Sequence, residues 1–125
     1  SVISVDGFTM ENCTVRGTKG TAPMAGIDFE PNSGLYGFTR CRVSNCSFTA
    51  NKGPGMLFYF IKLTEKHPPI DILVENCVSS KNRFALSVIG IPKTLEGSIV
   101  FSNTSLQGFK YIQIPKKSKF KVEFR

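Results

Sequence analysis

Apolar and polar residues alternate along the chain in short segments, and these segments recur at a nearly constant interval. Each interval contains an Asn followed by Cys or Thr, at Asn12-Cys13, Asn45-Cys46, Asn76-Cys77 and Asn103-Thr104. Successive Asn residues are 33, 31 and 27 positions apart. Alternation with a period of two predicts a strand with one buried face, and a repeat of about thirty residues predicts stacked units. The pattern therefore predicts a solenoid of short strands.

Each Asn separates two alternating segments. The segment before it places pairs of apolar residues on the inner face: Phe8 and Met10, Cys41 and Val43, Ile72 and Val74, Ile99 and Phe101. One apolar or small inner position follows it, at Val15, Phe48, Ser79 and Leu106. The Asn interrupts the alternation, which a residue in the left-handed backbone region can do. We expect the four Asn side chains to stack about 4.8 Å apart and to pair amides that would otherwise be buried without a partner.

A second alternating segment follows a Gly-rich or polar turn in each unit, at residues 26–30, 55–59, 85–89 and 111–114. Its predicted inner residues are Ile27, Phe29, Met56, Phe58, Leu86, Val88, Ile112 and Ile114. Three short strands per unit predict an all-β, right-handed parallel β-helix of about four coils, with residues 1–125 as one domain. Residues 120–124 begin a fifth coil. No capping helix is evident, so we expect a portion of a longer β-helix, or end-to-end packing of copies.

These repeats resemble those of the pectate-lyase-like superfamily, in which an Asn occupies the tight turn between the second and third sheets. Residues 26–32 (GIDFEPN) more specifically resemble a group of bacterial, secreted β-helix repeat proteins. The resemblance implies an extracellular or periplasmic location and a polysaccharide partner, acidic in some members. It also implies that the ligand lies along the outer face of the first sheet, which here contains residues 26–30.

Asp28 and Glu30 are the candidate catalytic residues. They are two positions apart on one predicted strand, so their side chains leave the same face about 6.6 Å apart. Inverting glycoside hydrolysis needs two carboxyl groups roughly 6.5–9.5 Å apart, one donating a proton and the other activating water. In lyases of the superfamily, Ca²⁺ neutralises an acidic sugar and a basic residue abstracts a proton. Lys52 and Arg83, in the turns before the next two strands, are the candidate basic partners.

Two further residues complete the predicted site. Asn32, together with Asp28 and Glu30, would offer oxygen ligands for Ca²⁺. Tyr59 is expected to stack beside Glu30 and to form a platform for a sugar ring. The sequence leaves three alternatives open: a polysaccharide hydrolase or lyase, a non-catalytic module for carbohydrate binding, adhesion or spacing, and an ordinary polar strand face.

The cysteines and the single histidine do not form a metal-binding pattern. There is no CxxC pair, and His67 lies in a polar, Pro-containing loop. Cys13, Cys46 and Cys77 occupy equivalent positions, and parallel stacked side chains are poorly oriented for a disulfide. We therefore expect a column of buried thiols that behave as small apolar residues, with Cys41 also in the core.

The net charge of +7 lies in the last third of the chain, where residues 81–125 contain nine Lys or Arg but only Glu96 and Glu123 as acids. A basic end attracts polyanions. Alternation of Lys119 and Lys121 with apolar residues favours an edge strand protected against aggregation. Nucleic acid is disfavoured, because no aromatic stacking platform lies within the basic cluster. No segment approaches the roughly 20 apolar residues of a transmembrane helix.

Overall fold

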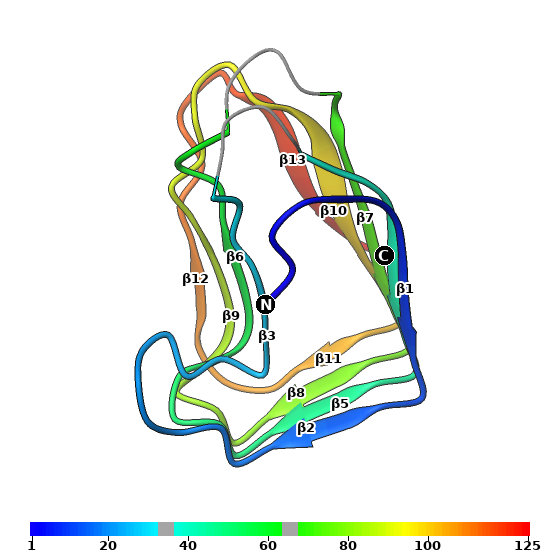
Figure 1. The fold of residues 1–125 in the computed structure, drawn as a ribbon, viewed down its shortest axis with the longest axis vertical. Coiled ribbons are helices and arrows are strands. Elements are labelled where there is room, and N and C mark those ends of the chain that lie inside the picture. Colours follow the sequence, from blue (N-terminus) through cyan, green and yellow to red (C-terminus); the bar gives the residue numbers. More distant parts are fainter. Residues whose placement is uncertain (33–36, 64–67) are drawn as a thin grey trace.

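A computed structural model describes residues 1–32, 37–63 and 68–125, which form three parallel sheets around one core (Figure 1). The β1 sheet contains β1 (Val5–Glu11), β4 (Phe38–Ser44), β7 (Ile70–Glu75), β10 (Glu96–Ser102) and β13 (Lys119–Phe124). The β2 sheet contains β2 (Thr14–Arg16), β5 (Ser47–Thr49), β8 (Val78–Ser80) and β11 (Ser105–Leu106). The β3 sheet contains β3 (Ile27–Phe29), β6 (Pro54–Tyr59), β9 (Phe84–Ile89) and β12 (Lys110–Ile112). The predicted all-β parallel solenoid is confirmed.

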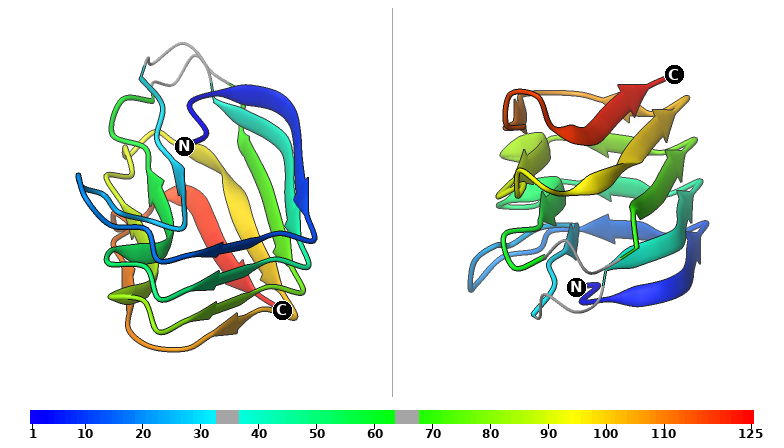
Figure 2. Two further views of the ribbon diagram at one scale, coloured as in Figure 1. Left: turned by 60° about the horizontal axis from the view of Figure 1, so that its bottom comes forward. Right: turned by 90° about the horizontal axis from the view of Figure 1, so that it is seen from above.

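The chain visits the three sheets in a fixed order, so that each coil lies on the one before it (Figure 2). We number the coils by their strands: β1–β3, β4–β6, β7–β9 and β10–β12, with β13 beyond them. Every strand pair is parallel and in register. In the β3 sheet, for example, Phe29 pairs with Phe58 and Phe58 with Val88. Residues at equivalent positions therefore contact one another from coil to coil.

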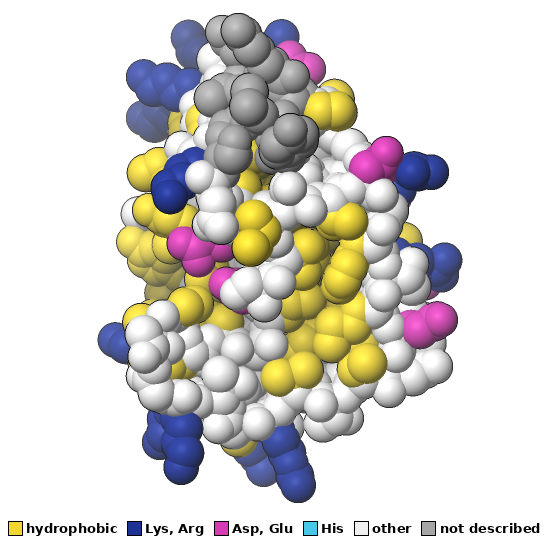
Figure 3. Space-filling model, viewed as in Figure 1, with side chains coloured by type: hydrophobic (Ala, Val, Ile, Leu, Met, Phe, Trp, Pro, Cys, Tyr) yellow, Lys and Arg dark blue, Asp and Glu magenta, His cyan; other side chains and the backbone are white. Residues whose placement is uncertain are grey.

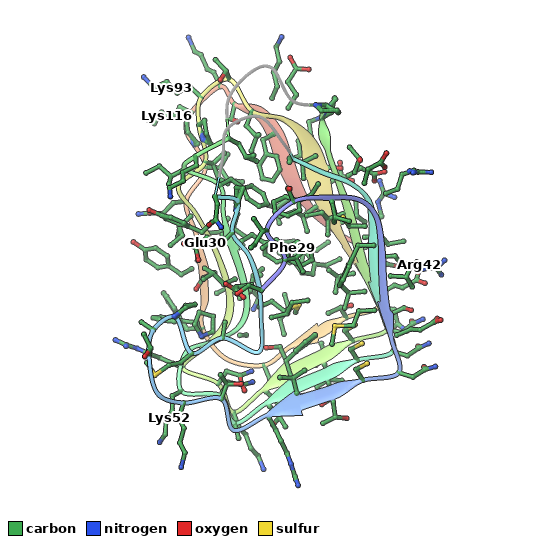
Figure 4. All side chains as sticks on the ribbon, in the orientation of Figure 1. Phe29, Glu30, Arg42, Lys52, Lys93 and Lys116 are labelled. Atoms are coloured by element: carbon green, nitrogen blue, oxygen red, sulfur yellow. The ribbon has the colours of Figure 1, made fainter. Side chains whose placement is uncertain are left out.

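The predicted inner residues form the core. Phe29, Phe58, Val43, Val74 and Ile99 are all fully buried. Phenylalanine rings pack between coils as well as across the interior: Phe29 stacks on Phe58 with centroids 5.0 Å apart and meets Phe38 edge-on at 5.4 Å. Phe29 lies in the middle of the cross-section (Figure 4). Each such pair contributes about 0.5–1.5 kcal/mol beyond simple burial.

The repeated Asn residues occupy the turns between the β1 and β2 sheets. Their φ angles are 59° at Asn12, 54° at Asn45, 53° at Asn76 and 46° at Asn103, which confirms the left-handed prediction. Asn103 Nδ2 donates to Asn76 Oδ1 at 2.7 Å. The expectation that these amides are buried is wrong, because all four residues are exposed. The left-handed turn directs their side chains out of the solenoid.

A different pair of asparagines points inward, at the turns between the β2 and β3 sheets, where Asn51 is buried and Asn82 is half-buried. Asn51 is 3% exposed, and its Nδ2 donates to Asn82 Oδ1 at 2.9 Å. Asn51 Oδ1 accepts from the Thr18 N–H at 3.0 Å, and Asn82 Nδ2 donates to the Phe48 carbonyl at 2.9 Å. Each amide thus links its own turn to the adjacent coil. This inner ladder was not predicted.

Glycine is required beside this ladder. A Cβ on Gly55 would lie 2.0 Å from Ser79 Oγ and 2.5 Å from Asn82 Nδ2. Gly26, the equivalent residue one coil earlier, would place a Cβ 2.6 Å from the Gly55 carbonyl oxygen. The interior at this corner is therefore filled by amide and hydroxyl groups, which leaves no room for larger side chains.

The two ends of the solenoid differ from its middle. The end seen in Figure 3 shows hydrophobic side chains between the sheets, and Val5, Phe8, Met10 and Val15 there are only partly buried. Val2 adds a bridge to Phe29 at the edge of β3. At the other end, β13 is the edge strand of the β1 sheet, with Lys119 and Lys121 exposed. This agrees with the predicted edge-strand role of these lysines.

Substitution of Asn45 tests the left-handed turn. Asn45→Gly should change the free energy of unfolding by less than about 0.5 kcal/mol, because Gly adopts positive φ freely. Asn45→Val should lower it by about 1–2 kcal/mol, because a β-branched residue is strained at φ 54°. Urea unfolding followed by circular dichroism would measure both. Equal effects of the two substitutions would contradict this account of the turn.

Candidate functional site

The outer face of the β3 sheet carries the predicted site. Strand pairing places Asp28, Leu57, Ser87 and Tyr111 in one column across the four strands. The next outward column contains Glu30, Tyr59, Ile89 and Gln113, as the sequence predicted. Half of these residues are apolar or aromatic, and the two carboxylates among them both belong to the first coil.

Asp28 lies on this face but is only 7% exposed. Its Oδ2 accepts a hydrogen bond from Ser1 Oγ at 2.9 Å, and the Ser1 amino group lies 3.3 Å from Oδ1. Residues 1–2 run along the edge of β3, because the Val2 N–H donates to the Asp28 carbonyl at 2.7 Å. The expectation that Asp28 is open to solvent is therefore wrong, since a segment 27 positions away in sequence covers it.

Glu30, Asn32 and Tyr59 lie at the end of the β3 sheet where its strands finish. Glu30 is half-buried, and its carboxylate forms no ion pair within the described part of the chain. Asn32 is exposed. Tyr59 is half-buried, and its ring covers Gly90, where an added Cβ would lie 3.0 Å from a ring carbon. Tyr59 is therefore beside Glu30 as predicted, but it is packed rather than free.

Lys52 and Arg83 lie at the opposite end of the sheet, in stacked turns that lead into β6 and β9. The Arg83 N–H donates to the Gly53 carbonyl at 3.2 Å, which fixes one turn on the other. Both side chains are exposed, and Figure 4 shows Lys52 at this corner. The Arg83 guanidinium lies 5.5 Å from the centroid of the Phe84 ring. Arg83 thus packs on the Phe84 ring. Glu30 lies at the other end of the sheet, so the structure does not bring these two predicted site residues together.

Sequence reasoning missed a cluster of three aromatic rings on this face, formed by Phe84, Phe109 and Tyr111. Their centroids are 5.8 Å apart for Phe84 and Phe109, 6.3 Å for Phe84 and Tyr111, and 6.4 Å for Phe109 and Tyr111. Phe109 is 62% exposed and Tyr111 is 41% exposed. The spacing of Phe109 and Tyr111, two residues apart where β12 begins, was the available signal.

The outer face of the β1 sheet is polar and internally paired. Arg40 Nε and Thr39 Oγ1 both donate to Asp6 Oδ1 at 2.8 Å, and these hydrogen bonds lower the pKa of the Asp6 carboxyl. Arg42, which projects outward in Figure 4, pairs with Glu75. Because the charges on this face satisfy one another, it is a weaker candidate for ligand binding than the β3 sheet.

The thiols form the predicted column, except at its first position. Cys46 is 3% exposed and Cys77 is 1% exposed, and Thr104 continues the column, with its Oγ1 3.3 Å from the Cys77 nitrogen. Cys13 belongs to the first coil and is exposed, so its predicted burial is wrong. All four cysteines are free. Burial raises the pKa of the Cys41 thiol to about 11, with smaller effects from Asp71 and Asp6.

The described residues contain no group of three or more His, Cys, Asp or Glu side chains able to hold a metal ion. Asp28 and Glu30 supply two carboxylates, one fewer than such a group requires. Their role in binding Ca²⁺ stays a prediction. His67 lies outside the described residues.

Comparison with protein-family models, curated proteins and solved structures found no match. The parallel β-solenoid therefore stands on the structure itself. Within residues 1–32, 37–63 and 68–125, no helix has the length and apolar character required to cross a membrane.

Thiol accessibility gives a direct test of the cysteine column. At pH 8, Cys13 should react with a thiol reagent at the rate of a solvent-exposed cysteine. Cys41, Cys46 and Cys77 should react slowly, because burial raises their pKa values and less thiolate is present. Mass spectrometry after brief alkylation should show one modification in the native protein and four in denaturant. Rapid modification of Cys46 or Cys77 would contradict their interior position.

Proposed function

We propose that this protein is a β-solenoid module that binds an extended polysaccharide along the outer face of the β3 sheet. The cluster of Phe84, Phe109 and Tyr111 carries the proposal. Two of its rings, Phe109 and Tyr111, are substantially exposed on the same sheet face on which Leu57 and Ser87 are buried. An exposed apolar patch of this kind commonly marks an interaction surface.

Sugar rings fit the chemistry of this surface. One face of a pyranose presents C–H groups that pack on a flat aromatic ring, while its hydroxyl groups hydrogen-bond to polar residues around it. Phenol rings suit such a surface, because Tyr combines an apolar body with a polar tip. Tyr111, Gln113 and Arg83 supply polar groups beside the rings, and the rings belong to two adjacent coils, so the contact extends along the solenoid axis.

Catalysis by Asp28 and Glu30 is the second proposal. The half-buried Glu30 carboxylate, with no described ionic partner and with Tyr59 beside it, supports a role for Glu30 as an acid or base. The contacts of Asp28 with Ser1 favour a structural role for Asp28 instead. Binding without cleavage is therefore the stronger proposal.

The double substitution Phe109→Ala/Tyr111→Ala tests the aromatic surface. We expect affinity for a responsive polysaccharide to fall about tenfold or more, because stacking contacts of this kind contribute roughly 1–3 kcal/mol. Isothermal titration against a panel of neutral and acidic polysaccharides would measure the loss. Phe124→Ala is the control for loss of an exposed ring elsewhere, because Phe124 is 53% exposed and stacks on Phe101 in the β1 sheet, not on this cluster. An unchanged affinity in the double variant would refute the proposed surface.

Catalysis is tested by Glu30→Gln and Asp28→Asn. If Glu30 is an acid or base, Glu30→Gln should reduce turnover of any cleaved polysaccharide at least a hundredfold and leave binding intact. Asp28→Asn should lower thermal stability, because it removes the charged acceptor of the Ser1 hydrogen bond. Reducing-end and unsaturated-product assays, with and without Ca²⁺, would distinguish hydrolysis from elimination. Undiminished turnover in both variants would exclude the pair from catalysis.

A further inference from the structure

Three β-turns follow the β3 sheet, one on each of the second, third and fourth coils. Each is closed by a hydrogen bond from an N–H to the carbonyl three residues earlier: Leu63 to Phe60 at 3.0 Å, Leu95 to Pro92 at 3.1 Å, and Ser118 to Pro115 at 3.2 Å. Leu63 and Leu95 are buried and anchor their turns in the core. The middle residues of each turn consequently project outward.

Four lysines occupy these outward positions: Lys62, Lys93, Lys116 and Lys117. We refer to them as the lysine corner. All are exposed, and none forms an ion pair within the described residues. The nearby Glu96 instead lies 3.7 Å from Lys119. Figure 4 shows Lys93 and Lys116 at the same corner of the cross-section, and Figure 3 shows basic side chains gathered there.

Unpaired like charges on stacked turns do not stabilise the fold. Adjacent coils are about 4.8 Å apart, so equivalent lysines repel one another, and like charges at directly opposed positions are destabilising. The β1 sheet shows the alternative available to this chain, because Arg40 and Arg42 there pair with Asp6 and Glu75. The lysine corner therefore carries a positive field that no carboxylate of residues 1–32, 37–63 and 68–125 neutralises, and an external anion would relieve it.

Free backbone donors lie immediately before these lysines. Pairing between β9 and β12 stops after Gln113, whose N–H donates to the Val88 carbonyl at 2.9 Å. Beyond this point the N–H groups of Gly90, Ile91 and Ile114 form no hydrogen bond in the described part of the chain. These three residues line a shallow hollow together with Ile112, Gln113 and Pro115. Unpaired N–H groups beside cationic side chains are the chemistry by which proteins bind oxyanions.

Gly90 makes this separation of the coils possible. Its φ is +66°, and an added Cβ would lie 3.0 Å from the Tyr59 ring and 3.2 Å from Ile61 Cβ. The left-handed residue turns the chain away from the sheet directly before Pro92 and Lys93. The same change of chain direction at Gly90 therefore leaves the N–H groups of Gly90 and Ile91 unpaired and leads into the turn that carries Lys93.

We propose that the lysine corner and this hollow form a binding site for oxyanions: sulfate, phosphate or carboxylate groups. Where such a group is carried by a polysaccharide, the inference rests on the proposed function, because the ligand would extend from the aromatic rings at the starts of β9 and β12 to the lysine corner beyond their ends. Free phosphate offers the same chemistry without a polymer, so the two sources are separated by experiment.

Free oxyanion is tested with inorganic phosphate, titrated at constant ionic strength into ¹⁵N-labelled protein. The amide signals of Gly90, Ile91 and Ile114 should shift saturably. Lys93→Gln/Lys116→Gln should weaken this binding about tenfold, because two surface charges are removed. Lys19→Gln/Lys121→Gln removes the same charge from exposed positions elsewhere and should change it less than twofold. Equal weakening in both variants, or no shift of these amides, would overturn the site.

Polymer-borne oxyanion is tested with dextran sulfate and neutral dextran. Tighter binding of dextran sulfate that is lost in Lys93→Gln/Lys116→Gln, but kept in the control variant, supports the site as part of the polysaccharide surface. Phosphate binding without binding of any polysaccharide would retain the oxyanion site and refute the proposed function. Binding of polysaccharides through the aromatic rings alone, with both lysine variants unaffected, would retain the proposed function and overturn the oxyanion site.

Discussion

The structure depends on the in-register stacking of one coil on the next. Parallel backbone hydrogen bonds fix this register, so every side chain contacts the residue at the equivalent position on adjacent coils. The choice of residue on one coil then restricts the choice on the next. Phe29 on Phe58 satisfies this restriction by ring stacking, and Asn51 with Asn82 satisfies it by hydrogen bonding. Gly55 satisfies it by leaving space for Ser79 and Asn82.

Features that follow from local geometry could be predicted from the sequence. Alternation assigned Phe29, Met56 and Val88 to the core, because successive side chains on a strand point to opposite faces. The left-handed backbone at Asn45 was predictable for a similar reason, since two inner residues flank it. Neither inference needs to know which strand lies next to which, beyond the regular spacing of the repeats.

Features that depend on long-range contacts could not be predicted in this way. The burial of Asp28 results from residues 1–2 lying along the edge of β3. The inner amide ladder had a sequence signal, because Asn51 and Asn82 are 31 residues apart, the same spacing as Asn45 and Asn76. The spacing alone does not tell which Asn faces inward. That depends on the turn: Asn45 has positive φ and points out, whereas the side chain of Asn51 reaches into the corner.

The same stacking decides which surface features suit an extended ligand. A polymer lying along a solenoid meets each coil in turn, so residues repeated on adjacent coils contact it several times. The two carboxylates of the β3 sheet occur on the first coil alone, whereas the cluster of Phe84, Phe109 and Tyr111 occupies the third and fourth coils and the lysine turns continue from the second coil to the fourth. A ligand held by repeated weak contacts gains affinity with every coil that it crosses, because the contacts after the first are effectively intramolecular. This advantage is the reason that we propose binding, and not cleavage, for the outer face of the β3 sheet.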